Sequence, residues 1–284
     1  MKFLVFGCNG MAGHLISLYL QERGHQVVGF ARERSRHVET VVGSAMQTDL
    51  VAKTVSEGKF DSVINCIGIL NQFAEKNKAE AAFLNAYFPH FLADVTDGTE
   101  TQVIHMSTDC VFSGKKGQYT EDDLRDGETF YDRSKALGEL EDGKNVTLRQ
   151  SIVGPDIKPG GIGLLNWFMQ QHGEINGYTK AIWTGQTTLQ LAKTMEAAAR
   201  DKISGLYNMV PDCGISKYEL LRLFNRYMRD DSVAINAVEG VNADKSLKRT
   251  RLDFDCPIPD YEQMVKELAD WMRQHKELYP HYCL

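Results

Sequence analysis

The sequence predicts an α/β fold in which helices cover both faces of a doubly wound parallel sheet. Three observations support this prediction. Short apolar runs alternate with helix-like stretches, a glycine-rich turn directly follows the first run, and 43% of the 284 residues are hydrophobic. Strands of a parallel sheet are buried on both faces and need continuous apolar runs. Their alternation with helices implies right-handed crossovers.

Five apolar runs are expected to be strands of this sheet, because each is short and rich in Val, Ile or Phe. They are KFLVF (2–6), QVVGF (26–30), VETVV (38–42), DSVINC (61–66) and QVIHMS (102–107). The segment ISLYLQERG after the first run has a helical pattern, and Gly24 is available to end that helix. Residues 1–152 are therefore expected to form the first domain.

The alternation of apolar runs and helix-like stretches ends after NVTLRQSIVG (145–154), where the loop PDIKPGGIG is rich in Pro and Gly. Helices mixed with irregular segments follow, so residues 153–284 are expected to form a smaller mixed lobe. Segments near 182–210 are expected to return to the first domain. We expect the lobe to pack over the carboxyl ends of the strands, where open α/β sheets bind ligands.

The composition argues against several classes of partner. A formal net charge of -6 disfavours nucleic acid and anionic membranes. The six cysteines are scattered without a CxxC pair, which fits a reducing cytoplasm. The opening apolar run is too short for a signal peptide, and no later run approaches membrane-spanning length. The eight histidines show no ligand spacing, so no protein-ligated metal is expected.

A GxxGxxG turn, Gly7 to Gly13, connects the first expected strand to the first expected helix. Gly7 permits the tight turn, Gly10 lets the backbone approach a diphosphate, and Gly13 lets the helix pack closely on the strand. The helix N-terminus then faces the anion. In this context the turn predicts dinucleotide binding and a Rossmann-like domain, whereas the alternative is a glycine turn without a ligand.

The loop GFARERS after the second expected strand bears on the choice of dinucleotide. It offers Arg32 and Arg34 where NAD-binding proteins usually present a carboxylate to the ribose hydroxyls, and we identify no acid at the strand's end. Arginine forks suit a 2′-phosphate, so NADPH is favoured, although NADH stays possible. The alternative is two solvated arginines on a loop.

The stretch YDRSK places Tyr131 and Lys135 one helical turn apart on one helix face. On its own this spacing is also typical of a solvated helix surface. Upstream, STDCVFSG delivers Ser107, Thr108 and Asp109 to the carboxyl edge of the sheet. The alternative is a phenol that acts as an acid beside an activating ammonium, and the residues alone leave both interpretations open.

A glycine loop, a strand-end hydroxyl and YxxxK in this order resemble the extended short-chain dehydrogenase/reductase superfamily. Within it, the chain most closely resembles the dTDP-4-dehydrorhamnose reductase family, on the segments STDCVFSG, YTEDD and YDRSKALGE. The usual motifs of that family are STDYVFDG and YGxSKxxGE. Cys110 and Ser113 depart from the first of these motifs. The resemblance covers essentially the whole chain. Further matching features are the segment 65–68, Asn85, Pro89 and LRQSIVGP (148–155).

The resemblance implies roles for the catalytic residues. Tyr131 would donate a proton, Lys135 would lower the phenol's pKa and hold the nicotinamide ribose, and Thr108 would hydrogen-bond the substrate oxygen. A free Tyr has a pKa of about 10, so a nearby positive charge would make it a better acid. Some relatives bridge a dimer with magnesium through a glutamate where this chain has Leu15.

The binding residues that we expect fall into two sets. For the cofactor they are Gly7, Asn9, Gly10, Met11, Gly13, Arg32, Arg34, Asp49, Leu50, Cys66, Ile67, Gly68, Asn85, Tyr131 and Lys135. For the substrate they are Ser107, Thr108, Asp109, Arg149, Trp183 and Arg249. Three alternatives stay open: Asp109 fixes its loop, Trp183 is ordinary core, and the two arginines are simply exposed charge. Cys8 and Cys66 are expected to pack rather than to react.

The function that these features predict is NADPH-dependent reduction of a 4-keto-6-deoxy nucleotide sugar, for a surface polysaccharide or another glycoconjugate. One alternative is a nucleotide-sugar epimerase or dehydratase, although dehydratases usually place acids directly after the catalytic hydroxyl. Another is a non-catalytic NADP-binding subunit, like the regulatory subunit of methionine adenosyltransferase. The protein is expected to be a monomer or a homodimer.

Overall fold

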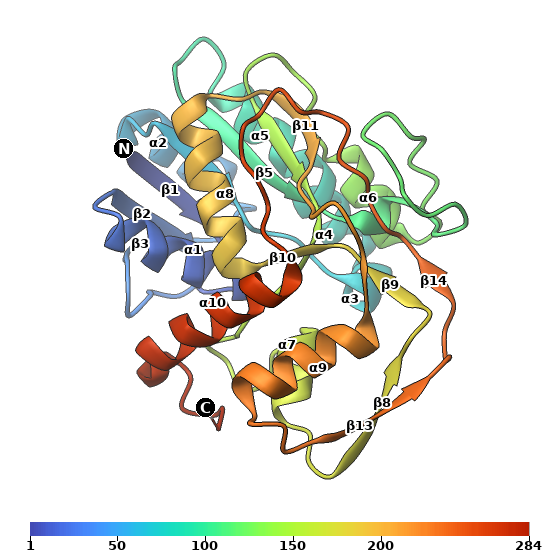
Figure 1. Ribbon diagram of the computed structural model, residues 1–284. Coiled ribbons are helices and arrows are strands. Elements are labelled where there is room, and N and C mark those ends of the chain that lie inside the picture. Colours follow the sequence, from blue (N-terminus) through green and yellow to red (C-terminus); the bar gives the residue numbers. More distant parts are fainter. Residues whose placement is uncertain (284) are drawn as a thin grey trace.

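A seven-stranded parallel sheet forms the centre of the computed structural model, which describes residues 1–283 (Figure 1). The strand order is β11-β6-β5-β4-β1-β2-β3. The bounds are β1 Lys2–Phe6, β2 Gln26–Ala31, β3 Glu39–Val42, β4 Ser62–Asn65, β5 Gln102–Ser107, β6 Val146–Arg149 and β11 Gly205–Asn208. The predicted fold class is confirmed, and the five expected strands agree with the structure to within one residue at each end.

Helices cover both faces of the sheet. Alternate residues of β1 belong to different hydrophobic clusters: Phe3 and Val5 to one, and Leu4 and Phe6 to the other. The first cluster includes α1 (Met11–Glu22) and α8 (Thr188–Asp201), and the second includes α2 (Thr48–Gly58) and α5 (Phe88–Val95). The strands are therefore buried on both sides, as their continuous apolar runs predict.

The chain crosses between the two halves of the sheet at β1, whose neighbours are β2 and β4. In open α/β sheets, the crevice at such a switch point is where ligands bind. The segment 188–208 joins the sheet layer, because α8 packs against α1 and β11 pairs with β6.

The remaining second half forms a mixed lobe with three small sheets, ordered β10-β7, β12-β9-β14 and β13-β8. Its strands are β7 Ser151–Val153, β8 Glu174–Tyr178, β9 Ala181–Trp183, β10 Gly185–Thr187, β12 Ile215–Ser216, β13 Ala234–Val238 and β14 Ala243–Asp244. Its helices are α7 Leu164–Met169, α9 Lys217–Met228 and α10 Tyr261–Gln274, followed by the short turn η3 Lys276–Leu278. In Figure 1, β8, β13, α7 and α9 lie together below the sheet.

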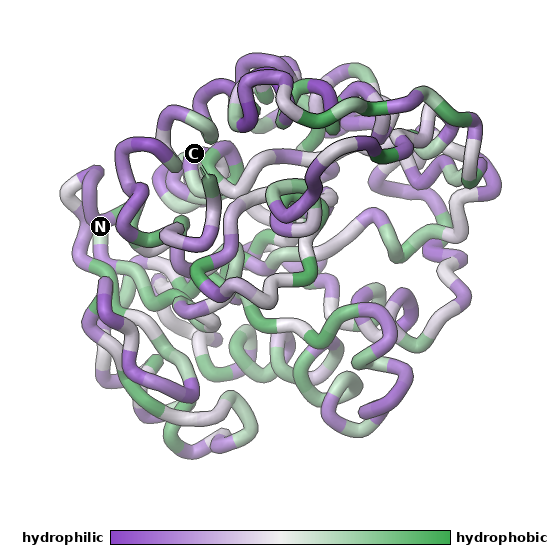
Figure 2. Tube along the Cα trace, turned by 90° about the horizontal axis from the view of Figure 1, so that it is seen from below, coloured by the Kyte–Doolittle hydropathy of each residue, from purple (hydrophilic) through white to green (hydrophobic). Residues whose placement is uncertain are grey.

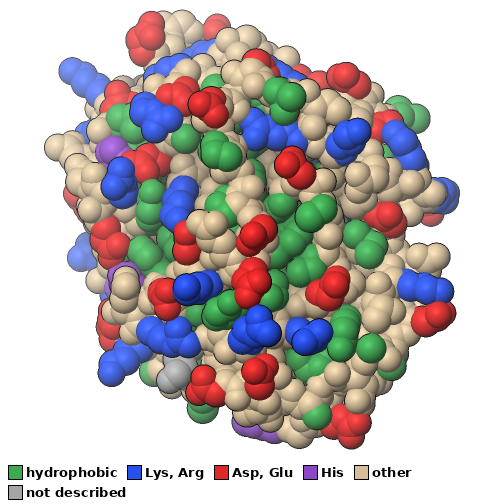
Figure 3. All heavy atoms as spheres, in the orientation of Figure 1, with side chains coloured by type: hydrophobic (Ala, Val, Ile, Leu, Met, Phe, Trp, Pro, Cys, Tyr) green, Lys and Arg blue, Asp and Glu red, His purple; other side chains and the backbone are tan. Residues whose placement is uncertain are grey.

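Short helical segments complete the first half: α3 Asn71–Lys76, α4 Lys78–Ala81, the π-helical turn η1 Ala82–Tyr87, the 3-10 turn η2 Asp109–Val111 and α6 Phe130–Leu137. Figure 2 shows hydrophilic stretches along much of the outer rim. On the face in Figure 3, side chains of both charge signs are intermixed. No helix among residues 1–283 is both long and apolar enough to cross a bilayer.

Candidate active site

The glycine turn builds one wall of a cavity at the switch point. Gly7 follows β1 with φ +80°, and its carbonyl oxygen accepts a hydrogen bond from the Gly10 amide at 2.8 Å. A Cβ at Gly13 would lie 2.2 Å from the Gly7 carbonyl oxygen, so only glycine lets α1 pack this closely. A Cβ at Gly10 would meet only that oxygen, at 3.3 Å. The start of α1 is thus accessible to an anion.

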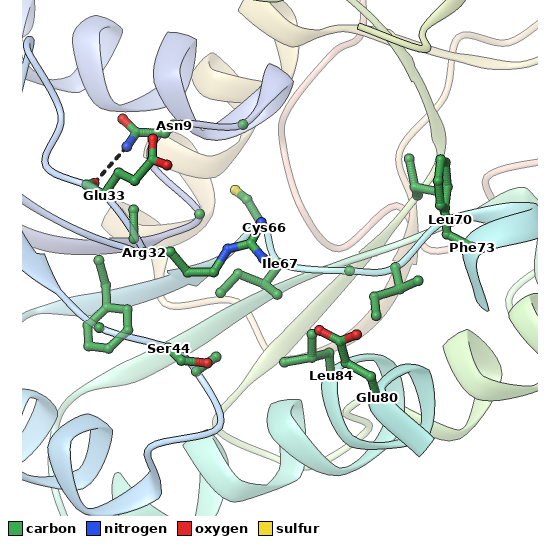
Figure 4. Close-up of a pocket in the computed structure, with 18 of the residues that line it drawn as sticks. Asn9, Arg32, Glu33, Ser44, Cys66, Ile67, Leu70, Phe73, Glu80 and Leu84 are labelled. Carbon is green, nitrogen blue, oxygen red and sulfur yellow. Dashed lines mark hydrogen bonds between the residues drawn. The ribbon is translucent and has the colours of Figure 1, made fainter. Parts of the chain in front are cut away.

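The cavity has a volume of about 830 Å³ and follows the carboxyl ends of β1, β2, β3 and β4. Its lining contains these residues expected to bind the cofactor: Gly7, Asn9, Gly10, Arg32, Cys66, Ile67 and Gly68. Figure 4 shows side chains from several of these strand ends around one space. Its size is in the range of pockets for cofactors and small ligands. The residues present therefore fit a dinucleotide.

Two charged side chains follow β2 in the cavity wall. In Figure 4 the Arg32 side chain extends toward Ile67, and Glu33 lies on the side of Asn9. The Asn9 amide donates to the Glu33 backbone carbonyl at 2.8 Å and so ties the loop after β2 to the glycine turn. The expectation that no acid lies here is wrong, because Glu33 directly follows Arg32 and also lines the cavity. Arg34 is exposed and lies outside the lining.

The loop after β3 contributes Gly43, Ser44 and Ala45 to the lining, which the sequence analysis missed. Asp49 and Leu50 do not line the cavity, because α2 begins at Thr48 and carries them along the helix. Asp49 is exposed, and the half-buried Leu50 lies against Gly43. Gly43, Ser44 and Ala45, which directly follow β3, therefore replace Asp49 and Leu50 as candidates.

Asn85 supports the cavity from outside. It is fully buried in the π-helical turn η1. Its amide nitrogen donates to the Ile69 carbonyl at 2.9 Å and to the Ser134 hydroxyl at 3.0 Å, and its oxygen accepts from the Ile69 amide at 2.8 Å. Asn85 therefore does not contact a ligand as expected. It holds Ile69, which lines the cavity, against α6.

The YDRSK residues lie on α6, whose first turn is fixed by a capping box between Thr129 and Asp132. Tyr131 and Lys135 are only 6% and 5% exposed, which rules out the alternative of a solvated helix face. Thr108 caps the turn η2, and its hydroxyl accepts from the Cys110 amide at 3.1 Å. The structure thus brings a buried hydroxyl, phenol and ammonium together where β5 ends.

Burial raises the pKa of Tyr131 above its ordinary value, and the nearby Cys110 and Asp109 raise it further, whereas a hydrogen bond with Thr108 lowers it. The expected direction is therefore wrong. The Lys135 ammonium donates to the Met106 carbonyl at 2.7 Å and lies 3.3 Å from His105 Nε2, on β5. Tyr131 consequently holds its proton at neutral pH.

Lys135 connects the catalytic residues to the cavity. Burial lowers its pKa to about 8, with the charges of Glu139 and Cys66 working in the opposite direction. Cys66 lines the cavity, and burial raises the pKa of its thiol to about 12, which agrees with packing rather than redox chemistry. Tyr131 shares a hydrophobic cluster with Ile69, another cavity residue.

Three polar residues at the end of β5 bond to other protein groups. The Thr108 hydroxyl donates to Asp109 Oδ1 at 3.1 Å, and burial raises the pKa of that carboxyl. This contact favours the loop-fixing alternative for Asp109. The Ser107 hydroxyl donates its proton to Glu139 Oε1 at 2.6 Å. Ser107 therefore faces a buried ion pair, contrary to the substrate contact expected of it.

Arg149 must be removed from the candidates for substrate binding. Its side chain has no exposed surface, and its guanidinium donates to the Glu139 carboxylate at 2.8 and 2.7 Å. It also lies over the ring of Phe112, with its central carbon 4.9 Å from the ring centroid. Both the charge and the face of this guanidinium are thus used inside the protein.

Trp183 and Arg249 also serve the fold. Trp183 is buried, and its ring centroid lies 5.6 Å from that of Tyr261, so it belongs to the core. The Arg249 guanidinium donates to the backbone carbonyls of Arg251, Phe254 and Cys256 and holds that turn. A ligand would have to compete with these bonds. Among residues 1–283 there is no cluster of three His, Cys, Asp or Glu side chains placed to hold a metal.

Comparison with known proteins gives consistent results. The model of the RmlD substrate binding domain family matches residues 1–272. The probable low-salt glycan biosynthesis reductase Agl14 of Haloferax volcanii is 35% identical over 143 residues, 49% of this chain and 48% of that protein. The dTDP-4-dehydrorhamnose reductase of Burkholderia thailandensis is 34% identical over 142 residues, 49% and 45% of the two chains. The chain spans about half the length of the curated relatives it matches.

Two solved structures resemble the chain along nearly its whole length. One is dTDP-4-dehydrorhamnose reductase from Bacillus anthracis in complex with NADP, with a TM-score of 0.79, 19% identity and coverage of 94% of this chain and 98% of that chain. The other is a dTDP-4-dehydrorhamnose reductase from Clostridium acetobutylicum, with a TM-score of 0.77, 21% identity and coverage of 96% and 100%. At these identities the likeness supports the fold alone.

Proposed function

The chain belongs to the RmlD substrate binding domain family, and from this premise we propose that it is an NADPH-dependent reductase of a nucleotide-sugar ketone. The observation that carries the proposal is the burial of Tyr131, Lys135 and Thr108 beside a cavity that begins at the glycine turn. Fold and cavity alone would also suit a binding subunit. A buried phenol beside a buried strand-end hydroxyl is suited to proton transfer.

The glycine turn, Arg32 and the loop from Cys66 to Gly68 would hold the dinucleotide. The start of α1 would face its diphosphate. Arg32 would meet the 2′-phosphate that distinguishes NADPH from NADH. When bound, the nicotinamide cofactor supplies a hydride to the ketone carbon.

Tyr131 would supply the proton. Its raised pKa keeps the phenol protonated until negative charge develops on the ketone oxygen, which then takes the proton. Thr108 would hold that oxygen by a second hydrogen bond. The Lys135 ammonium would hold the nicotinamide ribose and restore charge balance as the phenolate forms, at the cost of releasing one of its present partners, the Met106 carbonyl or His105 Nε2.

For the substrate we propose a 4-keto-6-deoxy nucleotide sugar, because several curated relatives are named dTDP-4-dehydrorhamnose reductase and two carry names from glycan or spore-coat polysaccharide biosynthesis. In this proposal residues 1–152, with the return near 182–210, bind the dinucleotide. Residues 153–284 bind the sugar nucleotide. The free, scattered cysteines suit a cytoplasmic enzyme.

The test is NADPH oxidation by the purified protein, followed by absorbance, with a panel of 4-keto nucleotide sugars differing in base and in sugar. We expect turnover with at least one member and none with the matching 4-hydroxy sugar. The Tyr131→Phe variant serves as the control for the chemical step. Tight NADPH binding without oxidation across the panel would reject the reductase and leave a binding subunit.

A further inference from the structure

One loop of the second lobe crosses the start of α1. Residues 154–163 connect β7 to α7. At the end of this loop, a Cβ on Gly163 would lie 3.0 Å from the sulfur of Met11, the first residue of α1. Lys158 and Ile162 of the loop line the same cavity as Gly7 and Gly10. The loop therefore forms a second part of the cavity wall, beside the start of α1.

The Lys158 ammonium is not committed to a partner in the protein. The Lys158 backbone amide donates to Asp156 Oδ1 at 2.9 Å, which shapes the loop, but among the described residues its ammonium forms no ion pair. Lysines on another exposed loop behave differently, since Lys115 pairs with Glu128 and Lys116 with Asp123. An unpaired cation at a cavity wall is available to an anionic ligand.

We propose that Lys158, from the loop beside the start of α1, binds the diphosphate of the dinucleotide. This assignment rests on the proposed function, because it requires a dinucleotide in the cavity. The start of α1 offers backbone N–H groups to the diphosphate, and Lys158, in the wall of the same cavity, offers a positive charge. Arg32 follows β2 and belongs to the 2′-phosphate end. The two cations are thus divided between the two anionic groups of NADPH.

The chain's last aromatic residues hold both walls. The Tyr282 hydroxyl donates to Asn166 Oδ1 at 2.6 Å and accepts from the Asp156 amide at 3.0 Å, so it fixes the Lys158 loop. His14 lies between Tyr279 and the Gly10 carbonyl, 2.9 Å from each. Burial lowers the pKa of His14 to about 4, so it is neutral. Its Nδ1–H therefore donates to Gly10, and its Nε2 accepts from Tyr279.

This arrangement makes Tyr282 a positioning residue for Lys158. Tyr282 is buried and its hydroxyl reaches the Lys158 loop through the Asp156 amide. Its effect on the cofactor should therefore pass through the Lys158 ammonium. We expect loss of the hydroxyl to loosen the loop without changing the glycine turn, which His14 holds separately.

The test compares Lys158→Met with Lys266→Met, a matched change at an exposed position on α10. Calorimetric titration would use NADPH, NADH and adenosine 2′-phosphate, which lacks a diphosphate. Lys158→Met should weaken NADPH and NADH by the same factor, roughly three- to tenfold, the scale of one partly exposed charge-assisted bond. It should leave adenosine 2′-phosphate unchanged. Lys266→Met should bind all three ligands as the parent does.

The outcomes separate this inference from the proposed function. If the parent binds neither dinucleotide, the proposed function is wrong. If the parent binds both and Lys158→Met binds them equally well, Lys158 is not a ligand and only the inference is wrong. If Lys158→Met weakens NADPH and adenosine 2′-phosphate but spares NADH, Lys158 serves the 2′-phosphate and the assignment is overturned.

A double-mutant cycle tests the positioning role. Tyr282→Phe alone should weaken both dinucleotides by less than Lys158→Met does. Combined with Lys158→Met it should cause no further loss, because the group that it positions is already gone. Fully additive losses would show that Tyr282 acts elsewhere and would overturn the positioning role.

Discussion

Replacing Arg149 by Met should destabilise the protein without specifically weakening its substrate affinity. The change keeps an apolar stem of similar length but removes a guanidinium that is fully buried against Glu139. Glu139 would then keep a carboxylate in a buried site with one of its cationic partners missing. Removing one member of a buried pair typically costs about 3–5 kcal/mol, mostly for the charge left behind.

The structure sets the expected magnitude near the lower end of that range. Arg125 also pairs with Glu139 and would remain, and the Ser107 hydroxyl would still donate to it. We therefore expect a loss of about 3 kcal/mol. An unfolding entropy of about 2.1 cal/mol/K per residue gives about 0.6 kcal/mol/K for 284 residues. The melting temperature should fall by about 5 °C.

Thermal unfolding followed by circular dichroism measures this loss, and Glu139→Gln provides the second side of a double-mutant cycle. Each single change leaves the other member of the pair as a buried charge without this partner. The double variant Glu139→Gln with Arg149→Met removes both charges, so it should be destabilised by less than the sum of the two single changes. KM for the nucleotide sugar should change little in any variant that remains folded. An unchanged melting temperature with a strongly raised KM would refute this reasoning and restore Arg149 as a substrate ligand.

Four further predictions concern the catalytic residues, the cofactor and metal ions. Tyr131→Phe should lower kcat on the order of 100-fold or more with NADPH affinity retained, whereas Lys135→Met should lower both; near-parental kcat in both folded variants would reject acid catalysis by α6. Because burial lowers the pKa of Lys135 to about 8, kcat/KM should fall as pH rises through that value and the ammonium loses its proton; the same alkaline limb in Lys135→Arg would assign it to another group. Arg32→Ala should weaken NADPH roughly tenfold and NADH little in calorimetric titration, and equal losses would contradict a 2′-phosphate contact. Chelator treatment should leave turnover unchanged; loss of activity that magnesium restores would show that a metal site was missed.

The parts of the site that depend on local sequence could be predicted. The turn from Gly7 to Gly13 follows from backbone geometry between one strand and one helix, and the five strands follow from continuous apolar runs. Tyr131 and Lys135 share a helix face by spacing alone. These features need no knowledge of distant contacts, and the structure contains each of them.

The parts that depend on distant contacts could not be predicted. Nothing near Arg149 in sequence reveals that Asn208, on β11, contributes to its buried environment. The side-chain amide of Asn85 hydrogen-bonds Ile69 and Ser134, which lie 16 and 49 residues away in the sequence. The prediction that Asp49 binds the cofactor was wrong for a local reason: the start of α2 is a helix boundary, and hydrophobic periodicity locates such boundaries poorly. Glu33 was visible in the sequence beside Arg32 and was overlooked.

The segment YDRSKALGE can now be explained by what each end of α6 contacts. Tyr131 and Lys135 lie toward the cavity, whereas Glu139, just beyond the helix, reaches the guanidinium of Arg149 at the end of β6. Gly138 permits this arrangement, because a Cβ there would lie 1.9 Å from the Asn85 carbonyl oxygen and would push α6 away from η1. The two ends therefore depend on each other. The close packing at Gly138 that lets Glu139 anchor Ser107 also fixes the depth at which Tyr131 is buried, and that depth keeps its proton in place.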